Sequence, residues 1–151
     1  MADKLDNPDG KHRDAHRLLQ MGALLFLLAL LVGFAVPRMA VPRLGLSTHL
    51  LGIMQGTFLL VAGLLWRRLS LSPATSRVGH FLAMYGCAAP WVANLLGAVW
   101  GAGSTMLPMA AGAARGSSLQ EGTIQVLLVS GALCLVSMAL VILWGLRSPQ
   151  P

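Results

Sequence analysis

The sequence predicts an all-α integral membrane protein built as a four-transmembrane-helix bundle. Of the 151 residues, 56% are hydrophobic and only 11% are charged, whereas soluble domains carry about 25% charged residues. The mean hydropathy is +0.70. The apolar residues also gather in four runs, each long enough at 1.5 Å per residue to cross a hydrocarbon core of about 30 Å. We therefore expect a membrane domain over residues 18–147, followed by a short tail over 148–151.

The chain begins with a polar segment, residues 1–17, which mixes acidic and basic side chains and has too few apolar residues to form a core. We expect a flexible tail there. The first span follows over residues 18–36, a Leu-rich run that is longer than the apolar region of a cleaved signal peptide. Pro37 is expected to end this helix.

The second and third spans contain most of the polar groups of the predicted membrane domain. The second span covers residues 47–66 and closes at a tryptophan followed by two arginines, a common arrangement at the membrane surface. The third covers residues 78–101. Polar groups in lipid are costly and are therefore candidates for a functional site. The candidates in these two spans are His49, Gln55, Tyr85 and Asn94.

A long connection rich in Gly, Ala and Ser occupies residues 102–120 and precedes the fourth span, residues 121–146. Loops of this length are often functional, so this one is expected to cap a site. The fourth span opens with Glu121, which is the only acidic residue after Asp14. A glutamate in the first turn of a helix complements the helix dipole, which is the simplest explanation for it.

The basic residues indicate the orientation of the spans. With a cytoplasmic N-terminus, eight of the eleven Lys and Arg residues lie inside and three lie outside. This bias predicts a multi-pass protein of the inner (cytoplasmic) membrane with both termini in the cytoplasm. The eight are Lys4, Lys11, Arg13, Arg17, Arg67, Arg68, Arg77 and Arg147, and the three are Arg38, Arg43 and Arg115.

Several function classes have no support in the sequence. The net charge is +6, but the eleven Lys and Arg residues lie between the apolar runs and at the ends of the chain, without interleaved aromatic residues, so no nucleic-acid partner is expected. No glycine-rich phosphate loop or nucleotide fingerprint occurs, and we expect no nucleotide cofactor. Cys87 and Cys134 lie inside spans without metal-ligand spacing. An isomerisation fits a chain this short, because it needs no second substrate.

His49 lies on the same face of its helix as Gly52 and Gly56, because steps of three and seven residues return close to the starting face. A helix face without side chains admits the backbone of a neighbouring helix, as in small-xxx-small packing, or a flat ligand. The imidazole itself is compatible with a hydrogen bond to another helix and with a ligand-binding role. The sequence alone allows a helix or a ligand against the glycine face, and a structural or a ligand-binding role for His49.

Depth in the membrane brings candidates from three spans together. Gln55 is about 120° around the helix from His49 and borders the same face. Tyr85 is expected near mid-membrane. Because successive spans run in opposite directions, four polar residues reach one leaflet, and their convergence predicts a site. They are His49, Asn94, Glu121 and Gln125.

Three segments, residues 42–66, 85–112 and 116–133, resemble the hydroxylaminobenzene mutases, which are small four-span membrane enzymes. The resemblance extends roughly over residues 18–146. It implies an isomerase that converts an arylhydroxylamine to an ortho-aminophenol. The hydroxyl group moves from nitrogen to the adjacent ring carbon without net redox change.

The second span also resembles, more distantly, that of styrene oxide isomerase, in which the corresponding histidine ligates a haem b that acts as a Lewis acid in a trimer. This resemblance implies that His49 is the metal ligand of a haem b, with Gly52, Gly56 and Trp91 beside the cofactor. It also implies a homo-oligomer, with a trimer favoured. The isomerase has Asn where this chain has Gln55.

The resulting hypothesis assigns catalytic roles to side chains around the haem. Asn94 and Gln55 orient the migrating hydroxyl group, while Tyr85 and Trp91 shape a slot for the aromatic ring. Haem-free acid catalysis through Glu121 is the fallback.

The competing class is a small proton-coupled membrane transporter or a non-catalytic membrane subunit. Small proton-coupled exporters use a carboxylate well inside the first span, and residues 18–36 contain none.

Overall fold

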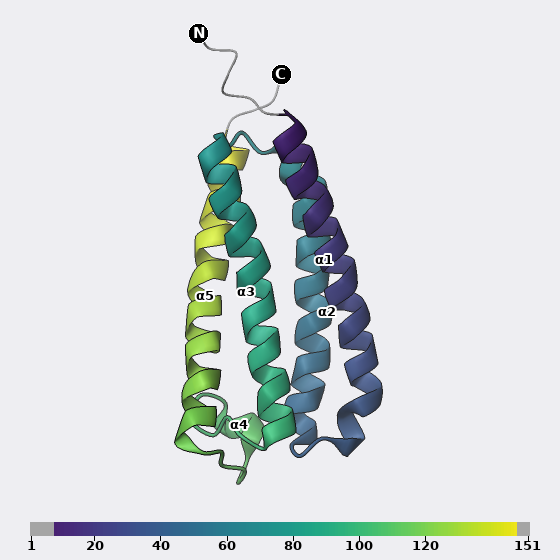
Figure 1. Cartoon of the computed structure of the whole chain (residues 1–151), viewed down its shortest axis with the longest axis vertical. Helices are drawn as coiled ribbons and strands as arrows, with labels where there is room; N and C mark the ends of the chain where they lie inside the picture. The colour runs from purple at the N-terminus through teal and green to yellow at the C-terminus, as the bar shows by residue number, and fades with distance from the viewer. Residues whose placement is uncertain (1–7, 148–151) are drawn as a thin grey trace.

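The computed structural model describes residues 8–147. Four long helices lie side by side within this range, and consecutive ones run in opposite directions (Figure 1). All four are long and apolar enough to cross a membrane, which confirms the predicted all-α membrane bundle. The helices are α1 (Pro8–Ala35), α2 (Pro42–Leu65), α3 (Pro73–Trp100), the short α4 (Pro108–Ala111) and α5 (Ser118–Leu146). Single 3₁₀ turns, Val36–Arg38 and Trp66–Arg68, follow α1 and α2.

The helices begin earlier than the sequence predicts. α2 begins at Pro42 and α3 at Pro73, each five residues before the expected start of its span. Proline is well suited to the first turn of a helix, because its φ is already helical and its missing N–H has no intrahelical partner there. α5 begins with a capping box formed by Ser117 and Gln120.

The predicted polar tail is helical in the part that the structure describes. Residues 8–17 form the beginning of α1, and Ala15 and Leu18 are buried against the rest of the bundle. The expected boundary at residue 18 is therefore not a boundary of secondary structure. Residues 1–7 of that segment, and the predicted C-terminal tail over residues 148–151, lie outside the described residues.

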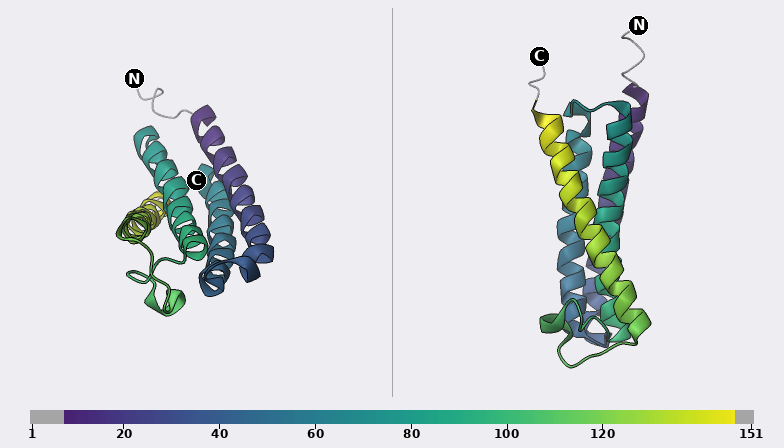
Figure 2. Two further views of the ribbon diagram at one scale, coloured as in Figure 1. Left: turned by 60° about the horizontal axis from the view of Figure 1, so that its bottom comes forward. Right: turned by 90° about the vertical axis from the view of Figure 1, so that its left-hand side faces the viewer.

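The bundle consists of two helix pairs. α1 packs along α2 and α5 packs along α3, and the contact between α2 and α3 joins the pairs (Figures 1 and 2). α3 is the central helix. Of its most apolar 18-residue stretch, 56% is buried inside the bundle, against 17% for the corresponding stretch of α1 and 11% for that of α5. The outer faces of α1 and α5 are therefore available to lipid or to another protein.

Glycine residues bring α1 and α2 into backbone contact. A Cβ atom added to Gly56 would lie 2.9 Å from the carbonyl oxygen of Gly22 and 2.9 Å from the backbone nitrogen of Phe26. Such close approach of two backbones is typical of helix pairs in membranes.

The loop between α3 and α5, which contains α4, covers the end of the bundle opposite the start of α1 (Figure 1). Apolar side chains hold this loop against the ends of α2 and α3. The buried members of the cluster are Val41, Leu44, Ala98 and Ala111. The loop therefore packs on the end of the bundle through a cluster that it shares with α2 and α3.

Candidate functional site

His49 forms a hydrogen bond to the neighbouring helix. Its Nδ1 atom lies 2.7 Å from the carbonyl oxygen of Ala29 on α1. A carbonyl oxygen can only accept a hydrogen bond, so Nδ1 carries the proton and donates. In the neutral ring the lone pair is then on Nε2, which is the arrangement found in histidines that ligate metals. The interhelical hydrogen bond and the ligand role, considered as alternatives from the sequence, are compatible in one side chain.

Gly33 on α1 makes room for this imidazole. A Cβ atom at Gly33 would lie 2.8 Å from Nδ1 of His49 and 3.0 Å from its Cε1. Gly33 is not among the site residues predicted from the sequence. Ala29 and Gly33 are spaced as a small-xxx-small pair inside the first span, and this spacing is the signal that could have identified it.

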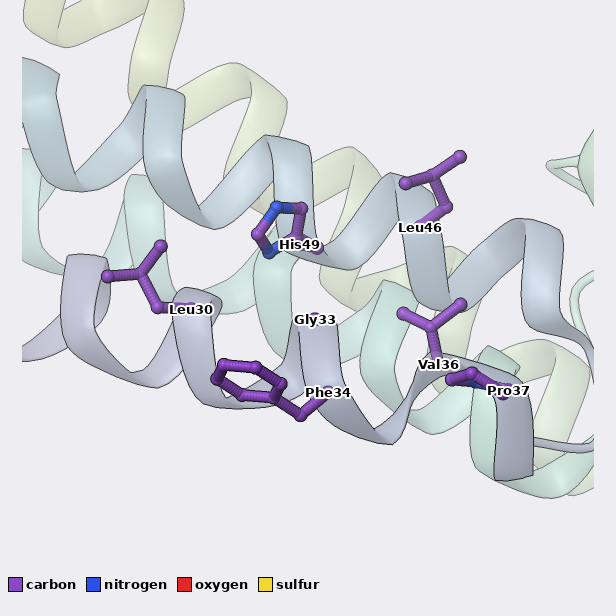
Figure 3. A pocket seen from close by; sticks show the side chains of 7 residues that line it. All are labelled: Leu30, Gly33, Phe34, Val36, Pro37, Leu46 and His49. Carbon is purple, nitrogen blue, oxygen red and sulfur yellow. The ribbon is translucent and has the colours of Figure 1, made fainter.

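The imidazole lines a groove of about 510 Å³ on the outer face of the α1–α2 pair (Figure 3). Figure 3 shows His49 on α2 with Leu30 and Phe34 of α1 on the facing helix. Phe34 is 80% exposed, so the groove opens to the membrane side of the bundle. We call it the histidine groove. Its lining is Leu30, Gly33, Phe34, Val36, Pro37, Leu46 and His49.

The glycine face of α2 is filled by α1 and α3. A Cβ atom at Gly52 would lie 2.5 Å from Nε1 of Trp91 and 2.6 Å from the Cβ of Ala29, and Gly56 contacts the backbone of α1. The sequence allowed either a neighbouring helix or a flat ligand against this face, and the structure shows a neighbouring helix. Within this chain Gly52 therefore packs against Trp91 and Ala29, and Gly56 packs against the backbone of α1. A side-chain-free face attracts a helix as readily as a ligand, because close packing drives association in lipid.

Gln55 and Asn94 line a second groove, which we call the amide groove. It measures about 570 Å³ and lies between α2 and α5 with α3 as its floor. Both amides are 6% exposed, and every other residue of the lining is apolar. The other lining residues are Leu51, Pro90, Met106, Leu107, Leu128, Val129, Ala132, Leu133, Leu135 and Val136.

The two amides keep hydrogen-bonding capacity for a ligand. Asn94 donates from Nδ2 to the carbonyl oxygen of Pro90 at 3.0 Å, which orients the amide and leaves its Oδ1 as an acceptor. Oε1 of Gln55 is buried and has no hydrogen-bond partner. Buried polar atoms are nearly always paired, so this unpaired acceptor in an apolar groove is a candidate hydrogen-bond acceptor for a ligand.

The structure separates His49 from the two amides. His49 lies seven residues from the start of α2 and Asn94 six residues from the end of α3, so both lie about 10 Å from the same end of the bundle. The two residues therefore lie at a similar level along the bundle. The two side chains nevertheless line different grooves, and a single chain does not assemble the convergent site that depth predicts.

Tyr85 ties α3 to α5. Its hydroxyl lies 2.8 Å from Oγ of Ser130, and Ser130 donates its own proton to the carbonyl oxygen of Val126 at 2.6 Å. Tyr85 is therefore the donor of the first bond. Its ring stacks on Phe81, with centroids 5.8 Å apart. Neither Tyr85 nor Trp91 lines the histidine groove or the amide groove defined above.

Glu121 contacts the loop before α5 and not His49 or Asn94. Its Oε1 accepts hydrogen bonds from the backbone nitrogens of Gly103 at 2.8 Å and of Gly116 at 3.1 Å. Gln125, expected in the same site, is exposed on α5. The fallback of acid catalysis through Glu121 therefore has no geometric support, because its oxygens are occupied by donors from the loop.

Within residues 8–147, no group of three or more His, Cys, Asp or Glu side chains is arranged to hold a metal ion. A haem iron needs only one axial side chain, because the porphyrin supplies the other ligands. The Nε2 atom of His49, with its tautomer set by Ala29 and an apolar groove beside it, fits that requirement.

The fold and these grooves define a small polytopic membrane protein with polar groups buried among apolar walls. Its sequence matches the profile of the styrene oxide isomerase family over residues 14–147. The chain belongs to this family, and it is accordingly a membrane isomerase.

Two relatives from Ectopseudomonas oleovorans extend the comparison. The hydroxylaminobenzene mutase HabB is 49% identical over 134 residues, which are 89% of this chain and 82% of the relative. The hydroxylaminobenzene mutase HabA is 38% identical over 129 residues, which are 85% of this chain and 96% of the relative. No solved structure gives a significant match.

Proposed function

We propose that this isomerase is a membrane-bound mutase that rearranges hydroxylaminobenzene and related arylhydroxylamines to 2-aminophenols. The 49% identity to a hydroxylaminobenzene mutase over most of both chains supports the substrate class. The observation that carries the chemistry is the imidazole of His49, which is tied to Ala29 through Nδ1 and has Nε2 free.

The reaction is an isomerisation whose atoms balance within the substrate. The N–O bond breaks and a C–O bond forms at the adjacent ring carbon. That carbon loses its proton, and the nitrogen gains one. No external oxidant or reductant is needed, which agrees with a chain that lacks a nucleotide-binding motif.

We propose that His49 holds a haem b through Nε2. When bound, the haem supplies a Lewis acid that assists cleavage of the N–O bond. The protein orients the ligating ring through the hydrogen bond from Nδ1 to Ala29, and Gly33 leaves the space that the ring occupies. The apolar lining of the histidine groove limits the access of water.

The amide groove provides the contacts that an arylhydroxylamine needs. Oδ1 of Asn94 and Oε1 of Gln55 can accept hydrogen bonds from the N–H and O–H groups of the substrate. The leucine, valine and alanine side chains around them fit an aromatic ring. These contacts hold the migrating hydroxyl close to the ring carbon that receives it.

We propose a homo-oligomer, with a trimer favoured, as the active form. The Lewis acid and the amides must reach one substrate molecule, yet His49 and Asn94 line different grooves of the chain. A neighbouring copy that places its amide groove against the histidine groove would complete the site. Leu30 and Phe34 beside His49 are exposed, so a neighbouring copy can reach this groove.

We also propose that the protein lies in the inner membrane with both termini in the cytoplasm. The bias of Lys and Arg residues supports this orientation. The start of α1 and the end of α5 at one end of the bundle agree with it (Figure 1).

One experiment tests the function directly. The protein, purified in detergent, is incubated with phenylhydroxylamine, and the products are separated by chromatography. We expect 2-aminophenol, together with a Soret band in the visible spectrum that is lost in His49→Ala. Absence of 2-aminophenol would contradict the mutase, and absence of a Soret band in an active preparation would contradict the haem.

A further inference from the structure

The loop between α3 and α5 contributes part of the amide groove. Met106 and Leu107 line the groove together with Gln55 and Asn94. We call residues 103–107 the lid segment, because it crosses from the end of α3 over the loop end of this groove. Leu107 also packs against the cluster that holds the loop on the bundle.

A single side chain, Glu121 of α5, binds both ends of this loop. Its Oε1 accepts hydrogen bonds from the backbone nitrogens of Gly103 at 2.8 Å, Ser104 at 3.2 Å and Gly116 at 3.1 Å. Its Oε2 accepts one from the backbone nitrogen of Thr105 at 3.1 Å. The hydroxyl of Ser104 adds a fifth bond to Oε1 at 3.3 Å. Hydrogen bonds to a carboxylate are stronger than those between neutral groups.

The lid segment is shaped so that its successive N–H groups point at this carboxylate. Gly103 has a φ of 113°, a conformation that favours glycine. The backbone nitrogen of Leu107 then donates to the carbonyl oxygen of Gly103 at 2.7 Å, which closes a turn. Glu121 therefore fixes the positions of residues 103–105. Because the turn connects these residues to Met106 and Leu107, it fixes the positions of those two side chains as well.

We propose that Glu121 is a positioning residue that latches the lid segment over the amide groove and keeps water away from the reacting substrate. This inference rests on the proposed mutase function. It assigns Glu121 a role through the loop, without contact to the substrate. In a closed groove the hydroxyl that leaves nitrogen returns to the adjacent ring carbon.

Opening the lid changes the chemistry in a measurable way. Once the N–O bond is broken, a solvent water molecule can attack the ring carbon instead. The original hydroxyl group is then released as water, and the proton it takes up is balanced by the one that the attacking water molecule loses. The attacked carbon also loses its proton, and the nitrogen gains one. The product is still an aminophenol, but its oxygen comes from solvent, and attack at the para carbon gives 4-aminophenol.

The test compares Glu121→Gln and Leu107→Ala with the wild type in water enriched in ¹⁸O. Leu119→Ala serves as the control, because this residue is 81% exposed on α5, two residues before Glu121. We expect both lid variants to raise ¹⁸O incorporation, or the share of 4-aminophenol, by about tenfold, which corresponds to the loss of one strong interaction. The control should match the wild type.

Hydrogen–deuterium exchange of the full-length protein in detergent supplies a readout that needs no activity. In Glu121→Gln the backbone amides of residues 103–105 and of Gly116 should exchange faster, while those of α2 and α3 stay protected. Unchanged exchange would overturn the latch. Faster exchange with unchanged products and unchanged ¹⁸O content would overturn its role in excluding water. A wild-type protein without mutase activity would instead refute the proposed function, and the exchange measurement would still decide whether Glu121 holds the loop.

Discussion

His49 on α2 and Ala29 on α1 are joined by a hydrogen bond of 2.7 Å from Nδ1 to the carbonyl oxygen. This bond determines which nitrogen of the imidazole carries the proton, and it makes the orientation of the ring on α2 depend on the close packing of α1. The contact is possible because Gly33, four residues after Ala29, has no side chain to occupy the space of the ring.

Replacing Gly33 by alanine should therefore disturb His49 directly. The added methyl group would lie 2.8 Å from Nδ1, so the ring must move and the bond to Ala29 must lengthen. Loss of such a supporting bond typically lowers metal affinity or activity by about 10- to 100-fold. The Soret absorbance per mole of protein and the rate of 2-aminophenol formation measure this. Gly122→Ala is the control, because a Cβ atom there meets nothing within 4 Å; equal losses in both variants would contradict the prediction.

Gln55→Met should raise stability and lower activity at the same time. The Oε1 atom of Gln55 is buried without a partner, and replacing an unpaired buried polar group by an apolar one of similar size should stabilise the fold by about 1 kcal/mol. The same change removes an acceptor for the substrate. Thermal unfolding in detergent and kcat/KM for phenylhydroxylamine are the two measurements. A variant that is less stable than the wild type would show that Gln55 has a structural partner in the oligomer.

Mixed oligomers should recover activity if the site lies between copies. We expect His49→Ala and Asn94→Leu to be inactive when each is expressed alone. When they are expressed together in equal amounts, an interface is intact only if one copy supplies His49 and its neighbour supplies Asn94. Random assembly then predicts about one quarter of the wild-type activity in the mixture. No recovery in isolated mixed oligomers, identified by two different affinity tags, would mean that each chain completes its own site.

Tyr85→Phe should affect stability more than catalysis. The hydroxyl of Tyr85 donates to Ser130 and does not line the amide groove. Removing the bond should cost about 1 kcal/mol of unfolding free energy. A double-mutant cycle with Ser130→Ala should show that the two effects are not additive. A large fall in kcat with unchanged stability would instead restore the catalytic role that the sequence suggested.

Features that depend on the composition of a single segment could be predicted from the sequence. Hydropathy places the four spans, since crossing a bilayer depends on the length and composition of each segment alone. An ionisable residue inside an apolar run is unusual in itself, and this selected His49 without any structure. The starts of α2 and α3 lie before the apolar runs, because Pro42 and Pro73 are favoured first residues of a helix and hydropathy alone does not mark them.

Which faces of the helices meet was decided by the tertiary structure. In a soluble bundle the buried face is marked by hydrophobic residues, but in lipid the outer face is equally apolar, so the hydrophobic pattern does not mark the packed face. The glycines at positions 52 and 56 could therefore have faced a ligand or a helix, and the pairing with α1 shows the helix. For the same reason depth brought His49 and Asn94 to one level, but only the arrangement of α1, α2 and α5 assigns them to separate grooves.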